Sequence, residues 1–348
     1  MEPAPGARMQ DLSVEDFPGM HAYTDVAGWA PLRDALAARE VERTGVPTSP
    51  AEVLLTAGGT AGLAAAASAL LAEGDEVLVL APYWPLIAGM VRVAHGVPVE
   101  VPFFVPSAGP DPRVDPAAAT ALLDRYWTPR ARVLYVNSPH NPTGTVLPRA
   151  VLAALAAWAQ SRGLWIWSDE VYAQLCWGGV HHPMRPMAPE RTLGVHSFSK
   201  AYGMAGNRCG WLVGPAEVLA EVRKVSVHTV YGAPTASQVA AFRALSVAGE
   251  WSERLRDQYA ATARHAAETL GLPEPAGSTF LFFDVAHRLD ARGLTGFLTD
   301  AADRGILLAP GPSFGPYPTH VRLCFTAVPP DRARRGLAVL ADLLRGRS

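Results

Sequence analysis

His196-Ser-Phe-Ser-Lys-Ala-Tyr-Gly-Met-Ala-Gly-Asn-Arg-Cys-Gly210 is the most informative stretch of this sequence. It follows an apolar run, residues 192–195, that is typical of a buried strand ending at a site. Lys200 is one of two lysines, the other being Lys224, although lysine and arginine together number 30. Arginine cannot be deprotonated or form a Schiff base, whereas a desolvated lysine can do both. The lysine at this position therefore indicates a need for a primary amine.

Phosphate-binding side chains surround this lysine in the sequence. Ser197 and Ser199 precede it, and Arg208 follows eight residues later. Hydroxyls and a guanidinium are groups that hold a phosphate. An imine-forming amine beside a phosphate cradle is typical of an enzyme that uses pyridoxal 5'-phosphate (PLP). The alternative interpretation of the stretch alone is a surface lysine in a glycine-rich loop.

Composition limits the class of protein. The 348 residues can build one large domain and a smaller one, and 49% hydrophobic against 18% charged residues is typical of a globular protein with a sizeable core. The net charge is −2 with no basic run, so we expect no nucleic-acid partner. The three cysteines lie far apart and follow no metal-binding spacing, which favours reduced thiols, no metal and a cytoplasmic location.

No segment predicts export or membrane insertion. Residues 1–12 lack the apolar core of a signal peptide. The uncharged run 53–72 is long enough to span a bilayer, but it consists mostly of alanine, glycine, threonine and serine. Such a run is too weakly apolar to insert, so we expect no membrane partner.

The chain alternates between strand-like and helical patterns, which predicts a largely parallel α/β sheet with helices on both faces. The expected strands are 53–56, 76–81, 97–103, 133–137, 164–168, 193–198 and 209–213, with helices at 60–73, 86–94, 117–125 and 149–162. After a long helix at 250–270, short strands at 279–284 and 321–326 alternate with helices at 294–304 and 330–344, which predicts a smaller α+β domain around a loop at 309–318. We predict a large domain at 44–246 and a small domain formed by 1–43 and 247–348.

Several predicted strands are followed by residues suited to ligand binding, as expected at the carboxyl ends of strands in an α/β sheet. Gly58-Gly59-Thr60 opens a helix whose N-terminus offers N–H groups to an anion. An acid at the end of an apolar strand, Asp169, needs a positive partner if it is buried, and a pyridinium nitrogen is one. The other candidates are the ring of Trp84, the amide of Asn141 and the hydroxyl of Tyr172. The alternative is an ordinary turn for Gly58-Gly59, core packing for Trp84 and surface exposure for Asp169.

In their order along the chain, these residues resemble the class I/II aminotransferases, which are fold-type I PLP enzymes related to aspartate aminotransferase. The resemblance runs from Tyr23 to Phe325, which is nearly the whole chain. Its motifs are Tyr23-x4-Gly28, Gly58-Gly59-Thr60, Tyr83-Trp84-Pro85, Asn141-Pro142-Thr143-Gly144, Asp169-x-x-Tyr172, Ser197-x-Ser199-Lys200-x7-Arg208 and Val321-Arg322-Leu323.

The resemblance implies a role for each motif. Lys200 would carry PLP as a Schiff base and move a proton at the substrate Cα, while Asp169 would keep the pyridine nitrogen protonated. Arg322 would pair with the substrate α-carboxylate through its two-pronged guanidinium. The phenolic oxygen would contact Asn141 and Tyr172, the ring would stack on Trp84, and the phosphate would contact Gly59, Thr60, Ser197, Ser199 and Arg208. The catalytic residues would be Lys200, Asp169 and Tyr172, and the substrate would contact Arg322, Asn141 and Trp84.

The resemblance also implies assembly: Tyr23 would reach the PLP phosphate of a neighbouring subunit, so the active site would lie at the interface of a homodimer. Local packing of an N-terminal segment is the alternative role for Tyr23. We expect 22 residues ahead of Tyr23 to be too few for the arm and closing loop of the family, and too few for the DNA-binding module of a regulator with an aminotransferase-like domain.

The expected activity is transfer of an amino group from an L-α-amino acid to a 2-oxo acid by a ping-pong mechanism. A PLP-dependent lyase, cyclase or oxidative enzyme would use the same residues and stays open as an alternative. Residues 227–234 fall where aspartate aminotransferases carry an arginine for the side-chain carboxylate, but here they offer His228. This departure predicts a neutral or aromatic amino donor.

Overall fold

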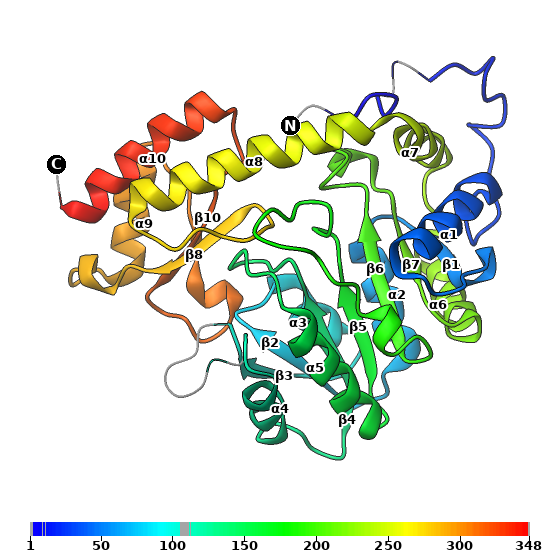
Figure 1. Cartoon of the computed structure of the whole chain (residues 1–348), viewed down its shortest axis with the longest axis horizontal. Helices are drawn as coiled ribbons and strands as arrows, with labels where there is room; N and C mark the ends of the chain where they lie inside the picture. Colours follow the sequence, from blue (N-terminus) through cyan, green and yellow to red (C-terminus); the bar gives the residue numbers. More distant parts are fainter. Residues whose placement is uncertain (1–2, 9, 11, 105–110, 112, 347–348) are drawn as a thin grey trace.

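The computed structural model describes residues 3–8, 10, 12–104, 111 and 113–346. A seven-stranded sheet lies at the centre of the larger part of the molecule, with strand order β1-β7-β6-β5-β4-β2-β3 (Figure 1). Neighbouring strands from β6 to β3 run parallel, whereas β7 is antiparallel to both β1 and β6. The strands are β1 (Val53–Thr56), β2 (Glu76–Ala81), β3 (Val97–Pro102), β4 (Ala131–Asn137), β5 (Trp165–Asp169), β6 (Thr192–Ser197) and β7 (Gly210–Val213).

Helices cover both faces of this sheet because its central strands are apolar on both sides. In β2, Val77 and Val79 pack on one face, while Leu78 and Leu80 pack on the other. The first face is covered by α2 (Gly59–Leu70), α3 (Pro85–Val93) and α6 (Ala216–Val230), and the second by α4 (Pro116–Asp124) and α5 (Arg149–Ser161).

A second, three-stranded antiparallel sheet has the strand order β8-β10-β9. Its strands are β8 (Phe280–Asp284), β9 (Ala309–Pro310) and β10 (His320–Cys324), and it packs with α9 (Gly293–Asp303) and α10 (Pro330–Arg345). The long helix α8 (Gly249–Leu270), yellow in Figure 1, extends from α7 (Thr235–Val247) to α10, so it links the two parts of the molecule. Short 3-10 helices lie at Pro50–Glu52, Arg185–Met187, Ala205–Asn207, Ala286–Arg288 and Gly311–Phe314.

The predicted fold class is confirmed, and the ends of the seven predicted strands are correct to within two residues. Helices α6 and α7 have no counterpart among the helices expected from the sequence. The buried side chains of α7 include Ser237, Gln238, Ala240 and Ala244, which are polar or small and so give little hydrophobic periodicity. The segment 309–318, which was expected to be a loop, contains β9 and a 3-10 helix.

The proposed domain division remains a prediction. Helix α1 (Ala30–Thr44) packs against β1 and α7, on the side of the larger sheet, so a boundary at residue 43 would separate α1 from the elements it contacts. Over the described ranges, no helix combines the length and the apolar character needed to cross a membrane.

Candidate active site

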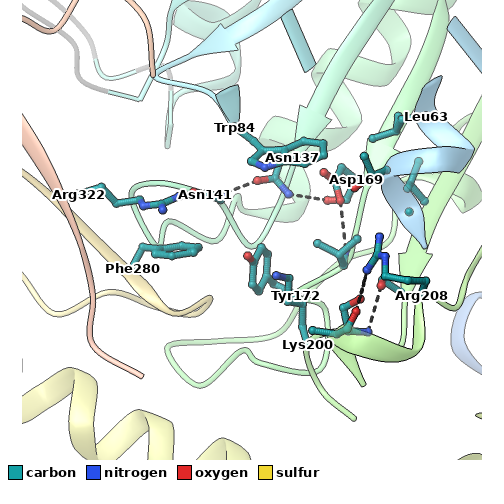
Figure 2. A pocket seen from close by; sticks show the side chains of 17 residues that line it. Leu63, Trp84, Asn137, Asn141, Asp169, Tyr172, Lys200, Arg208, Phe280 and Arg322 are labelled. Atoms are coloured by element: carbon teal, nitrogen blue, oxygen red, sulfur yellow. Dashed lines mark hydrogen bonds between the residues drawn. The ribbon is translucent and has the colours of Figure 1, made fainter. Parts of the chain in front are cut away.

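One cavity of about 290 Å³ lies at the carboxyl ends of β4, β5 and β6 and is closed on one side by the smaller sheet (Figure 2). It brings together every site residue expected from the sequence except Tyr23. These are Gly59, Thr60, Trp84, Asn141, Asp169, Tyr172, Ser197, Ser199, Lys200, Arg208 and Arg322. They come from segments far apart in the chain, which the larger sheet, its helices and β10 of the smaller sheet bring together.

An anion-binding cradle forms one end of the cavity. Gly59 is the first residue of α2, and the first N–H groups of a helix have no partner within the helix. Arg208 reaches this helix end from the loop after β6, with its Nη1 at 3.5 Å from Ser199 Oγ and its Nη2 at 3.4 Å from the Ala57 carbonyl. Gly58 has a φ of +84°, and a Cβ there would clash with the Arg208 guanidinium. The positive φ favours glycine at 58, and the missing side chain leaves room for the Arg208 guanidinium as it is placed.

Lys200 lies in the loop after β6, with its amine facing the cavity. Burial lowers the pKa of Lys200, partly offset by the nearby Cys324 and Asp169, while Arg322 and Arg208 lower it further. The Nζ lies 5.6 Å from the centroid of the Tyr172 ring. A lysine with a lowered pKa has a larger neutral fraction at physiological pH, and the neutral amine is the nucleophilic form.

Asp169 ends β5 and is 4% exposed. Its Oδ2 accepts a hydrogen bond of 2.6 Å from the Tyr135 hydroxyl, and its Oδ1 accepts one of 3.3 Å from the Val171 N–H. Burial raises the pKa of Asp169 to about 6, against the effects of these two hydrogen bonds and of Lys200. At neutral pH the cavity therefore contains a carboxylate that forms no direct ion pair with any described residue and would favour a cationic ligand group.

Arg322 enters the cavity from β10 of the smaller sheet. Its guanidinium carbon lies 4.2 Å from the centroid of the Phe280 ring and 4.8 Å from that of Phe314. Its Nη1 donates a 3.0 Å hydrogen bond to Asn141 Oδ1, while its buried Nε has no partner among the described residues. Two rings and one hydrogen bond hold the guanidinium in place with donor capacity left for a carboxylate.

Two residues singled out in the sequence lie elsewhere. Tyr23 precedes α1 and is 84% exposed, with its ring 4.7 Å from that of Tyr231. His228 is exposed in the last turn of α6, where its Nδ1 donates to the Lys224 carbonyl at 2.7 Å. Within this chain, neither residue lines the cavity.

Six further residues line the cavity that were not expected from the sequence. The additional lining residues are Leu63, Asn137, Val171, Val195, Ala205 and Phe280. Asn137 could have been found, because it ends a predicted buried strand; its Nδ2 donates to the Asp169 carbonyl at 2.8 Å. Phe280 has no such signal, because it reaches the cavity only through the packing of the smaller sheet.

The arrangement combines four chemical functions in one cavity. An anion site, a nucleophilic amine, a buried carboxylate and a guanidinium line the same space. Together they would accept a phosphorylated, carbonyl-bearing aromatic ring with a cationic nitrogen, and a second ligand with a carboxylate. Among the described residues, no group of three side chains of the metal-binding types is close enough to hold an ion.

Comparisons with known proteins agree with this chemistry. The sequence model of the family "Aminotransferase class I and II" matches residues 4–340. A probable aspartate/prephenate aminotransferase of Thermus aquaticus is 34% identical over 94% of this chain and 85% of its own length. An arginine–pyruvate transaminase of Pseudomonas aeruginosa is 33% identical over 94% of this chain and 84% of its own length. A tetra mutant of Thermus thermophilus aspartate aminotransferase has a similar structure, with a TM-score of 0.89, 32% identity and coverage of 99% of this chain and 93% of that chain.

Proposed function

Because this chain belongs to the class I and II aminotransferase family, we propose that it uses PLP to transfer the amino group of an L-α-amino acid to a 2-oxo acid by a ping-pong mechanism. The protein is an aminotransferase-family enzyme, as predicted from its sequence. The observation that carries the proposal is the convergence of Lys200, Asp169, Arg322 and the anion cradle on one cavity.

The residues present fit PLP. The cradle of Gly59, Ser199 and Arg208 suits a phosphate, and the absence of a side chain at Gly58 leaves the guanidinium room beside the helix end. Asp169 suits a protonated pyridine nitrogen, since an unpaired buried carboxylate gains most from a cationic partner. When bound, PLP supplies an aldehyde that forms imines with amines and an aromatic ring that takes up electrons.

Each cavity residue then has a defined task in the proposed reaction. With PLP bound, Lys200 would hold it through Nζ and would accept and return the proton at the substrate Cα. Asp169 holds the proton on the ring nitrogen, which is preorganised electrostatic stabilisation. Arg322 binds and orients the substrate α-carboxylate. The residues proposed to orient the cofactor are Asn141 and Tyr172 at its phenolic oxygen, Trp84 at its ring, and Thr60 and Ser197 with the cradle at its phosphate.

A product assay tests the reaction class. Amino transfer consumes one 2-oxo acid for each amino donor converted, whereas a lyase, a cyclase or an oxidative enzyme does not need a 2-oxo acid. We expect a screen of amino acids with a 2-oxo acid acceptor to show equal consumption of donor and acceptor. Donor turnover that continues unchanged without any 2-oxo acid would replace this proposal with the alternative PLP chemistry.

We further propose that a neutral or aromatic donor is preferred over aspartate. Among the described residues, the cationic side chains that line the cavity are Lys200, Arg208 and Arg322, and each has a proposed task already. A second substrate carboxylate would therefore be buried without a partner, which is costly. The relatives above are named for amino acids as different as aspartate and arginine, so family membership leaves this choice open.

Separate assays with different amino donors measure the donor preference. We expect kcat/KM for phenylalanine, tyrosine, methionine or leucine to exceed that for aspartate by at least about tenfold, the effect of a single unpaired polar group. The acceptor is kept constant and saturating in all assays, so that only the donor half of the reaction varies. Aspartate as the best of these donors would contradict the prediction and would point to a cation outside this chain's own cavity lining.

We propose that the protein works in the cytoplasm as a homodimer in which Tyr23 completes the neighbouring active site. An 84% exposed tyrosine beside a second exposed aromatic, Tyr231, is a surface suited to burial by a partner subunit. A hydrogen bond to a charged phosphate contributes about 1.5–3 kcal/mol, so Tyr23→Phe should raise the PLP dissociation constant by roughly tenfold to a hundredfold. Loss of packing alone would change little, because phenylalanine keeps the ring.

Mixed dimers distinguish a role across the interface from one within the chain. Heterodimers of wild type with Tyr23→Phe/Lys200→Ala, isolated through a tag on one subunit, contain a single lysine-bearing site that lacks the donated hydroxyl. That site should lose PLP as readily as Tyr23→Phe does, whereas heterodimers of wild type with Lys200→Ala should retain it. Equal retention in the two heterodimers, or full activity of a monomer in solution, would contradict the role across the interface.

A further inference from the structure

The residue behind the buried carboxylate of the cavity is Tyr135. Tyr135 does not line the cavity and is 2% exposed, but its hydroxyl donates a 2.6 Å hydrogen bond to Asp169 Oδ2. The sheet sets up this contact: β4 and β5 pair in parallel with Asn137 opposite Asp169, and Tyr135 lies two residues before Asn137 on the same face. A diagonal neighbour at that spacing is within reach of a long side chain.

While Asp169 is ionised the bond has a defined direction, because a carboxylate can only accept and the Tyr135 hydroxyl must donate. Burial raises the pKa of Tyr135 well above its ordinary value, and the charge of Asp169 raises it further, so the hydroxyl keeps its proton. The other titratable groups around Asp169 are Lys200 from the loop after β6 and Glu170 and Tyr172, which follow it in the chain. Lys200 is the proposed attachment point of the cofactor, so it is not available as a permanent partner. Tyr135 is thus the side-chain donor that the fold itself directs at this carboxylate.

We propose that Tyr135 is a positioning residue for Asp169: its hydroxyl holds Oδ2 in place and favours the ionised carboxylate that the cofactor site needs. This inference rests on the proposed function and adds a residue to it. A hydroxyl stabilises an ionised carboxylate more than a protonated carboxyl group, because a charged acceptor makes the stronger hydrogen bond. With phenylalanine at 135, Asp169 would therefore take up a proton at higher pH than in the wild type.

This difference has a signature in PLP binding that depends on pH. The pKa of Asp169 is about 6 in the protein without PLP. If PLP binds to the ionised carboxylate, protein that is protonated at Asp169 must first lose that proton, so affinity falls as the pH drops below this pKa. At a pH above the Asp169 pKa of both proteins, Asp169 is ionised before and after PLP binds. The wild type then has the Tyr135 hydrogen bond in both the free and the bound state, and the variant has it in neither. The hydrogen bond therefore does not change the dissociation constant of PLP. At a pH below both pKa values, deprotonation of Asp169 costs more free energy in the variant than in the wild type, so the variant binds PLP more weakly.

The experiment compares PLP dissociation constants of the wild type and Tyr135→Phe by equilibrium titration of the full chain. At about pH 8.5 we expect the two values to agree within about twofold, and at about pH 5.5 we expect the variant to bind about tenfold more weakly, which corresponds to a shift of about one pKa unit. Protonation of PLP and of the cradle affects both proteins equally, so it cancels in the ratio. We also compare Asp169→Asn with Tyr135→Phe/Asp169→Asn. Their PLP dissociation constants should have a ratio near one at both pH values, because the titrating group is gone.

A matched control separates this effect from the loss of any buried tyrosine hydroxyl. Tyr83 is also buried and donates a 2.6 Å hydrogen bond to a carboxylate, Glu100 Oε1, outside the cavity. Tyr83→Phe should leave the dissociation constant of PLP unchanged at both pH values. A Tyr135→Phe ratio that is the same at both pH values, or that persists with asparagine at 169, would overturn the role of Tyr135 alone. Wild-type protein that binds no PLP would overturn the proposed function, and the inference with it.

Discussion

Replacement of Lys200 by alanine should abolish amino transfer while leaving the protein folded. The variant would lose the amine that we propose to hold the cofactor and to move the proton at the substrate Cα, and a positioned acid–base group alone contributes up to about 10⁴-fold. We therefore expect turnover to fall by at least about 10⁴-fold. Steady-state assays with the best amino donor and circular dichroism of the same samples measure the two parts of the prediction.

Stability should not suffer from this change. Burial lowers the pKa of Lys200, so the folded protein binds a proton there less tightly than the unfolded chain does. As the pH drops below the pKa that the lysine has in the unfolded chain, the unfolded chain takes up a proton first and the folded state loses stability. At neutral pH the amine therefore opposes folding. Without PLP, the Tm of Lys200→Ala should therefore equal or exceed that of the wild type near pH 7.

The chain offers one matched control, because its only other lysine is Lys224. Lys224 lies on the outer side of α6 and forms an exposed ion pair with Glu221 at 2.6 Å. Lys224→Ala should keep wild-type activity, and borohydride reduction of the PLP-loaded wild type should label Lys200 and leave Lys224 unmodified. Near-normal turnover by Lys200→Ala, or no reducible PLP adduct at Lys200, would contradict the proposed role.

Asp169→Asn should leave PLP bound but reduce the rate by at least about 10²-fold, the typical contribution of a preorganised electrostatic group. Asparagine has the shape of aspartate and can still accept the Tyr135 hydrogen bond, so the site should stay intact. An amide carries no negative charge, however, and cannot stabilise a protonated ring nitrogen as a carboxylate does. Single-turnover rates with a saturating donor, measured near pH 8 where Asp169 is ionised, isolate this loss from changes in binding.

A second aspartate serves as the control for this substitution. Asp284 is exposed at the end of β8, outside the cavity, and Asp284→Asn should change the rate by less than about twofold. A decrease of less than about tenfold for Asp169→Asn, equivalent to roughly 1.4 kcal/mol of barrier, would contradict the role of the carboxylate. Loss of PLP from the variant would instead mean that Asp169 acts mainly in binding.

Much of the site could be predicted because its chemistry is local in the sequence. Lys200 is notable in a chain that otherwise uses arginine, and Asp169 directly follows an apolar strand. In an α/β sheet the carboxyl ends of parallel strands meet at one edge, so residues that follow the strands come together without any knowledge of the packing. The family resemblance added Arg322, which no local pattern connects to the other residues.

The sequence by itself determined the alternation of strands and helices, the mostly parallel sheet and the residue types gathered at its edge. These depend on short-range periodicity and on side-chain chemistry, and both can be recognised in short segments of the sequence. The tertiary structure alone decided that Phe280 and Phe314 both contact the Arg322 guanidinium, that the Tyr135 hydroxyl donates to Asp169, and that His228 lies away from the cavity. Arg322 and Asn141 are separated by 181 positions in the chain yet share a hydrogen bond, and such contacts depend on how two sheets pack together. Side-chain packing between distant segments leaves no period in the sequence, which is why only the folded chain reveals these partners.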